Sequence, residues 1–290
     1  MAFQIDYAKF WKTNAASLQN FQQAEQVPVD LPLPGDWICE LLGLDNVKYY
    51  SDYRYQQESQ LKAGELTKRH LGCEILPAID FGVILEASIY GGKVHYESNA
   101  TPTLEPVVQD PGDIDQLVET MDQKKDLLEC GLVPLFLEWR EKLFRDYSIQ
   151  VVYGDSLKGC ATMMGQICGL TNFLTWIATD PEQIHKLIDC WFRTSQRYLE
   201  AMRKATDFPK NKKGFYFYSD VSEMLSPRMY DEFIKEYEKG IYDRYAPGSE
   251  DVRYYHADYH MLHHLNPGTP FEHLQAVLYA AETYGYIYGS

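Results

Sequence analysis

Residues 214-GFYFYSDVSEMLSPRMYDEFIKEYEKGIYDRYA-246 hold a short aromatic run, an acidic residue and a long polar segment in direct succession. The run at 215–219 is rich in Phe and Tyr, which favour β-strands, and Asp220 follows it. Ser226 is a suitable helix N-cap, and Pro227 suits the first helical turn. The stretch therefore predicts a strand over 215–219 and a helix over 226–246.

The same order of strand and helix recurs along the chain. Three further buried strands are predicted, at 75–80, 149–153 and 252–257. Helices are predicted over 6–24, 50–72, 113–126, 131–147, 159–170 and 180–205. The last is the clearest, because Pro181 follows a capping Asp180 and one apolar face carries Ile184, Leu187, Ile188 and Trp191. Strands that alternate with long helices predict a parallel sheet with helices packed outside it.

Each predicted strand ends in polar side chains. These are Asp80, Asp155, Asp220 and, at the end of the last strand, His256 and Asp258. When a parallel sheet closes into a barrel, its active site lies at the carboxyl ends of the strands. One Asp after a strand is commonly a loop or cap residue, whereas four such ends together favour an enzyme.

Composition excludes several classes of function. The chain has 290 residues, 45% of them hydrophobic, and a net charge of −15. This charge disfavours nucleic acid and anionic membranes as partners. No apolar run reaches the length of a membrane span, and the first residues lack the pattern of a signal peptide. The six cysteines form no CxxC and are expected as free thiols. We expect a cytoplasmic protein.

Several segments together resemble a known family. They are 76-LPAIDFGVILEASIYGGKVHY-96, 151-VVYGDSLKGCATMMGQICGLTNFLTWIATDPEQIHKLID-189, 217-FYSDVSEMLSPRMYDEFIKEYEKGIYDRY-245 and 256-HADYHMLHHL-265. This order is similar to that of the uroporphyrinogen decarboxylase superfamily, from about Asp36 onward. The resemblance implies an α/β fold of the (β/α)8 TIM-barrel type. We expect one barrel domain over 1–290, with a helical extension at about 1–35.

The resemblance also assigns candidate site residues. It places Asp80 on the pocket aspartate that binds pyrrole N–H groups in the decarboxylases, and Tyr153 and Gly154 on a pocket strand. Asp220 falls just before the LSP helix, and His256 matches the histidine of an H-x-C motif in the zinc methyltransferases. We predict Asp80, Asp220 and His256 as catalytic. Tyr218 is a further predicted substrate contact, because tyrosine offers an apolar body with a polar tip, although packing against helices explains many of the tyrosines.

Two departures from the superfamily bear on the chemistry. The stretch 28-PVDLPLPGDWICELLGL-44 contains no arginine, whereas the decarboxylases carry a paired-arginine motif there for substrate carboxylates. The thiolate position of H-x-C is Asp258 here. His256, Asp258 and His260 could bind zinc or another divalent metal. Alternatively, His256 and Asp258 form a hydrogen-bonded pair that holds substrate or the fold without metal.

The barrel is expected to be shortened near its C-terminal end. The last helix, which begins within 266-NPGTPFEHLQAVLYAAETYG-285, follows 256-HADYHMLHHL-265 directly, where relatives have further strand–helix units. Either a segment is omitted between Leu265 and Asn266, or a partner chain closes the gap, with a homodimer as one such arrangement.

Three functions remain open at this stage. The first is a methyltransferase that moves a methyl group from a corrinoid (cobalamin), carried free or on a separate corrinoid protein, to a small-molecule substrate. The second is decarboxylation of a tetrapyrrole, and the third is a non-catalytic barrel that binds a small molecule.

Overall fold

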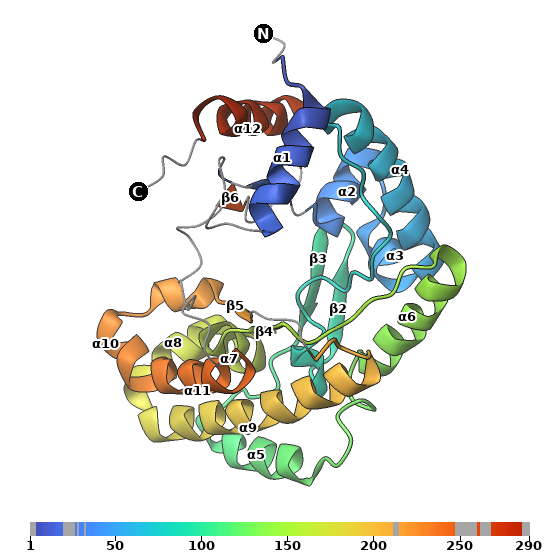
Figure 1. Ribbon diagram of the computed structural model, residues 1–290. Coiled ribbons are helices and arrows are strands. Elements are labelled where there is room, and N and C mark those ends of the chain that lie inside the picture. Colours follow the sequence, from blue (N-terminus) through green and yellow to red (C-terminus); the bar gives the residue numbers. More distant parts are fainter. Residues whose placement is uncertain are drawn as a thin grey trace. The chain divides into compact units, whose positions relative to one another are not determined.

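The computed structural model describes residues 4–19, 27, 29–31, 33–210, 215–246, 260–261 and 268–285 (Figure 1). His256 and Asp258 lie outside these residues, and only the backbone of His260 is described. The chain divides into two compact units. The first comprises Met1–Gly82, Tyr96–Thr101 and Arg253–Ser290, and the second comprises Val83–His95 and Pro102–Val252. The single domain predicted over 1–290 stays a prediction.

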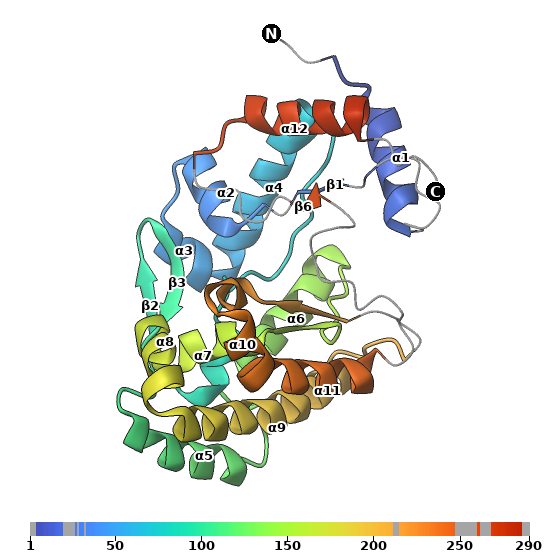
Figure 2. The same cartoon turned by 90° about the vertical axis from the view of Figure 1, so that its left-hand side faces the viewer.

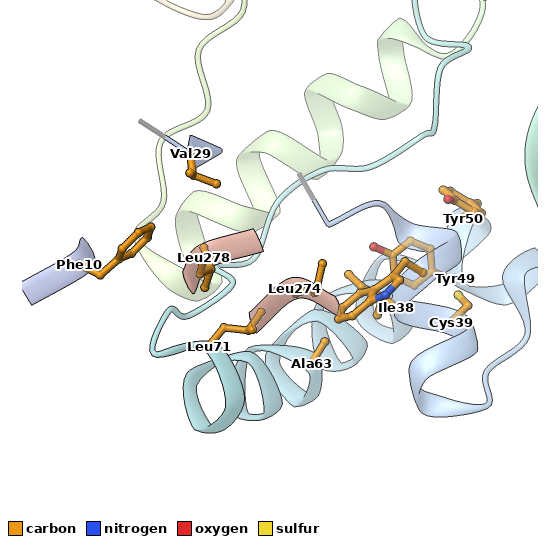
Figure 3. Close-up of a cluster of buried hydrophobic side chains, with 11 residues drawn as sticks. Phe10, Val29, Ile38, Cys39, Tyr49, Tyr50, Ala63, Leu71, Leu274 and Leu278 are labelled. Carbon is orange, nitrogen blue, oxygen red and sulfur yellow. The ribbon is translucent and has the colours of Figure 1, made fainter. Parts of the chain in front are cut away.

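The first unit is built mainly of helices. Its elements are α1 (Tyr7–Gln19), β1 (Val29–Asp30), α2 (Gly35–Leu42), α3 (Asn46–Ser51), α4 (Tyr53–Leu71), β6 (His260–Met261) and α12 (Phe271–Tyr284). Figure 3 shows its core, where Phe10 of α1, Leu71 of α4 and Leu278 of α12 are almost wholly buried. Segments from both ends of the chain therefore share one hydrophobic core. The predicted helices over 6–24 and 50–72 are confirmed in their central parts.

The predicted strand at 75–80 is wrong. Among the described residues this segment has no strand partner, and side chains of α4 satisfy its backbone groups. Asp80 N donates to Gln56 Oε1 (2.9 Å), and Gln56 Nε2 donates to Asp80 O (2.6 Å). Ala78 N donates to Gln60 Oε1 (2.7 Å), and Gln57 Nε2 donates to Ala78 O (2.9 Å). Three buried glutamines thus satisfy the backbone N–H and C=O groups that a neighbouring strand would satisfy in a sheet.

The second unit carries the longest helix. Its helices are η2 (Ala87–Tyr90), η3 (Pro111–Asp113), α5 (Ile114–Gln123), α6 (Val133–Tyr147), α7 (Cys160–Cys168), α8 (Leu170–Thr179), α9 (Pro181–Ala205), η4 (Asp220–Met224), α10 (Pro227–Met229), the π-helical η5 (Tyr230–Ile234) and α11 (Lys235–Tyr245). The helix predicted over 226–246 is therefore α10, η5 and α11 in succession. Ser226 caps it as predicted, since its side chain accepts from Met229 N. Helix α5 lies along α9 in both views (Figures 1 and 2).

Helix α9 confirms the amphipathic pattern read from the sequence. Pro181 is its first residue, and the four apolar side chains predicted to share a face, Ile184, Leu187, Ile188 and Trp191, have no measurable exposure. Asp180 occupies the N-cap position, but its side chain makes no capping hydrogen bond there. Burial of this face, rather than the cap, holds the helix in the second unit.

The strands of the second unit are short. Strand β4 (Ser156–Lys158) pairs in parallel with β5 (Tyr216–Tyr218), and the register places Lys158 beside Tyr218. Strand β5 confirms the strand predicted at 215–219. The strand predicted at 149–153 is wrong, because β4 begins only at Ser156. Side chains hold the backbone of that segment instead, since Arg140 Nε donates to Val151 O and Tyr153 N donates to Thr206 Oγ1.

Across the described residues, the sheets have two strands each. They are β1 with β6, β4 with β5, and the hairpin of β2 (Val94–Glu97) with β3 (Ala100–Leu104). The fold is thus mixed helix and strand, and its parallel pairs have the arrangement expected of an α/β sheet. The full barrel stays a prediction, and the strand predicted at 252–257 lies outside the described residues. In the described part of the chain, no helix has the length and apolar character needed to cross a membrane.

Candidate functional site

Asp80 is a partly buried acid of the first unit. Its Oδ1 accepts from Gly82 N (2.7 Å), and its Oδ2 accepts a long hydrogen bond from the Tyr49 hydroxyl (3.4 Å). Burial raises the pKa of the Asp80 carboxyl, and the nearby Asp36 acts in the same direction. Such a carboxyl can hold a proton at a pH where an exposed aspartate is ionised.

The backbone approaches Asp80 closely at Gly35, the first residue of α2. A Cβ at this position would lie 2.6 Å from Asp80 Oδ2 and 2.7 Å from the Tyr50 hydroxyl oxygen. Any larger residue would have to displace the acid, so glycine is required here. The second acid, Asp36, is tied to its own helix by the Trp37 N–H, which donates to Asp36 Oδ1 (2.9 Å).

The carboxyl ends of β4 and β5 form a second polar centre, in the second unit. Lys158 and Tyr218 are register partners at the ends of these parallel strands, and Asp220 follows two residues after Tyr218. Gly159 N donates to Tyr218 O (2.7 Å), which extends the pairing beyond the strands. Ligands of parallel α/β sheets bind at this end of the strands, so these residues are candidates for a ligand site.

The two faces of this strand pair differ in character. Leu157 and Phe217 are buried at 1% and 3% exposure, and Phe217 packs against Trp191 of α9 and Tyr242 of α11. Because side chains alternate along a strand, Lys158 and Tyr218 share the opposite face. Tyr218 is 43% exposed, and its hydroxyl donates to that of Tyr216 on the same face (3.1 Å). Helices therefore cover the face of Leu157 and Phe217, and on the polar face Tyr218 is exposed while Lys158 and Tyr216 are partly buried.

Glu86, just before η2, is a buried acid that the sequence reasoning missed. Its side chain is 7% exposed; the Tyr153 hydroxyl donates to Oε1 (2.5 Å), and Lys158 N donates to Oε2 (2.8 Å). Burial raises the pKa of the Glu86 carboxyl, whereas Lys158 and the hydrogen bond from Tyr153 act against that rise. The signal in the sequence was an acid inside the apolar run 83-VILEASIY-90.

Lys158 was also missed, because it lies between the strand predicted at 149–153 and the helix predicted at 159–170. Burial lowers the pKa of its ammonium, and the charges of Glu86 and Asp220 act in the opposite direction. Its side chain is partly buried, whereas Asp220 is exposed. The second polar centre therefore combines a buried acid, Glu86, a partly buried cation, Lys158, and an exposed acid, Asp220.

A model of the family described as uroporphyrinogen decarboxylase (URO-D) matches residues 48–266, which span most of the chain and include both polar centres. The chain belongs to this family. In this URO-D family member, the resemblance read from the sequence is therefore confirmed.

Two methyltransferases of Methanosarcina mazei are similar to this URO-D family member, one in sequence and one in structure. A methylated-thiol–coenzyme M methyltransferase of Methanosarcina mazei is 30% identical over 110 residues, which is 38% of this chain and 28% of that protein. The chain thus aligns with less than a third of that relative's length. The solved structure of a methyltransferase from Methanosarcina mazei superposes with a TM-score of 0.55 at 16% identity, over 81% of this chain and 66% of the other. This second likeness shows a shared fold.

The predicted site residues of this URO-D family member that the structure describes with their side chains lie in both units. Tyr153, Gly154, Tyr218 and Asp220 belong to the second unit, and Asp80 belongs to the first. Tyr218 is the register partner of Lys158, and the Tyr153 hydroxyl donates a hydrogen bond to Glu86. Gly154 lies against α9, where Arg203 Nε donates to its carbonyl (2.7 Å). Their roles in substrate binding and catalysis stay predictions.

The metal set predicted for this URO-D family member lies largely outside the described residues. His256 and Asp258 are outside them, and the side chain of His260 is not described. Across the residues that are described, no three His, Cys, Asp or Glu side chains form a group that could hold a metal ion.

Proposed function

We propose that this URO-D family member is a methyltransferase that transfers a methyl group from a corrinoid to a small acceptor, a thiol in the first instance. The observation that supports this most strongly is its 30% identity with a methylated-thiol–coenzyme M methyltransferase over 110 residues. The absence of arginine from residues 28–44 supports it too, because that segment then offers no guanidinium groups to bind a substrate with many carboxylates.

The two polar centres supply different chemistry. At the carboxyl ends of β4 and β5, Lys158, Tyr218 and Asp220 would bind and orient the acceptor. Tyr153, fixed by its bond to Glu86, would form a wall of that site. Asp80 is a candidate to hold or move a proton, since its burial favours the protonated form. His256, Asp258 and His260 remain our proposed metal ligands.

The test is methyl transfer from methylcobalamin to a small thiol by the purified protein. We expect demethylation of the cobalamin, followed by absorbance, and formation of the methyl thioether, followed by mass spectrometry. Bound metal is measured in parallel, and His256→Ala should lower it. Transfer that is no faster than without protein would remove the proposed function. Unchanged metal content and activity in His256→Ala would remove only the metal role.

Decarboxylation of a tetrapyrrole is the second candidate, because the matching family model is that of uroporphyrinogen decarboxylase. In that case Asp80 would accept hydrogen bonds from pyrrole N–H groups, and no metal is needed. Tight porphyrin binding, seen as a shift of the porphyrin absorbance, together with absent methyl transfer would favour this candidate.

A further inference from the structure

The ammonium of Lys158 has no close acceptor in the described part of the chain. Its backbone N–H is bonded to Glu86, but its Nζ donates no hydrogen bond and makes no ion pair within 4.0 Å there. Glu86 and Asp220 act on it only through their charge. This nitrogen is not fully buried, so water or an anionic ligand can reach it and accept its hydrogen bonds.

The neighbouring acids are poorly placed to accept those hydrogen bonds. Both oxygens of Glu86 already accept one hydrogen bond, from the Tyr153 hydroxyl and from Lys158 N. Asp220 is exposed, so water and salt weaken its effect. The charge of Lys158 therefore remains available on the polar face of β4 and β5.

This polar face also offers hydroxyl groups beside the charge. Tyr218 is the register partner of Lys158, and Tyr216 lies on the same face with its hydroxyl bonded to that of Tyr218. An anionic group bound by Lys158 would leave the rest of a small ligand against these aromatic rings. One lysine suits one anionic group, in contrast to a substrate with many carboxylates.

We propose that Lys158 binds a single carboxylate or sulfonate of the small-molecule acceptor and so selects anionic over neutral acceptors. This inference rests on the proposed function and specifies the substrate class of the same site. The binding test below needs no turnover, so it can fail or succeed separately from methyl transfer.

The test compares three small ligands by calorimetry on the full chain. They are 3-mercaptopropionate, the neutral 1-propanethiol, and propane-1-sulfonate, which carries an anion but no thiol. The variants are Lys158→Met, which keeps the length of the side chain, and Lys158→Arg, which keeps the charge. The control is Lys186→Met, which removes the same charge from an exposed ion pair with Asp115 on another part of the second unit.

We expect the wild type and Lys186→Met to bind 3-mercaptopropionate about tenfold or more tightly than 1-propanethiol, a difference of about 1.4 kcal/mol. Lys158→Met should lose this preference, and Lys158→Arg should keep part of it. Circular dichroism of each variant establishes that it is folded. The proposal is wrong if the wild type shows no preference for the anion, or if Lys158→Met keeps it.

Methyl transfer separates the two proposals. Binding of propane-1-sulfonate that depends on Lys158, without any methyl transfer, would uphold the anion site and remove the proposed function. Methyl transfer with an anion preference that Lys158→Met leaves intact would uphold the function and overturn the anion site.

Discussion

At the scale of single residues, the carboxyl group of Glu86 connects three parts of the second unit. Glu86 lies just before η2, and its carboxylate accepts hydrogen bonds from the Tyr153 hydroxyl, before β4, and from Lys158 N, at the end of β4. A buried carboxyl is stable only when its oxygens have donors, and both do. Sequence reasoning identified Tyr153 but not the acid that holds it, since an acid within an apolar run has no periodic signal.

The raised pKa of Glu86 predicts a specific pH dependence of stability. An acid with a higher pKa in the folded state than in the unfolded state binds its proton more tightly when folded. Its contribution to the free energy of unfolding is therefore largest below its unfolded pKa and is lost as pH rises through the folded pKa. Glu86→Gln cannot ionise and should lose less stability over the same rise in pH.

Urea unfolding of the wild type and Glu86→Gln at a series of pH values from about 4 upward measures this effect. The expected result is a difference between the two proteins that changes with pH by about 1.4 kcal/mol per unit of pKa shift. Glu141→Gln, at an exposed position of α6, is the control and should follow the wild type. A constant offset between wild type and Glu86→Gln would contradict the raised pKa.

At the scale of elements, α4 shows why part of the fold could not be read from the sequence. The stretch 53-YRYQQESQLKAGELTKRHL-71 is polar and was read correctly as a helix ending at Gly72. Its glutamines look like a solvated face, yet Gln56, Gln57 and Gln60 are buried and bonded to the 76–80 segment or to Tyr49. The spacing of apolar residues identified helices such as α9, whereas strand positions depended on partners far away in the chain.

Removing one of these glutamines should destabilise the first unit. Gln56→Ala leaves Asp80 N and Asp80 O without their partners, and each unsatisfied buried group costs about 1–3 kcal/mol. We therefore expect a loss of about 2–4 kcal/mol in denaturant unfolding. Glu58→Ala, at an exposed position of the same helix, should change stability by less than about 0.5 kcal/mol. Equal effects of the two variants would show that the glutamine bonds contribute little.

At the scale of the whole molecule, the family match spans residues 48–266 and so runs through both units. Resemblance predicted the family and the mixed α/β class, whereas the roles assigned to Tyr218 and Asp220 stay predictions. It did not predict Lys158 as a site residue, because only the pairing of β4 with β5 places this side chain beside Tyr218. In a chain with a net charge of −15, Lys158 lies on a polar strand face without a close acceptor among the residues that the structure describes. This local positive charge favours an anionic ligand.

The most direct measurement of the central claim is a crystal structure of the full chain with 3-mercaptopropionate bound. The account predicts the ligand on the face shared by Lys158, Tyr216 and Tyr218, with its carboxylate within about 4 Å of Lys158 Nζ. A ligand bound elsewhere, with Lys158 Nζ paired to an acid of the protein itself, would contradict it.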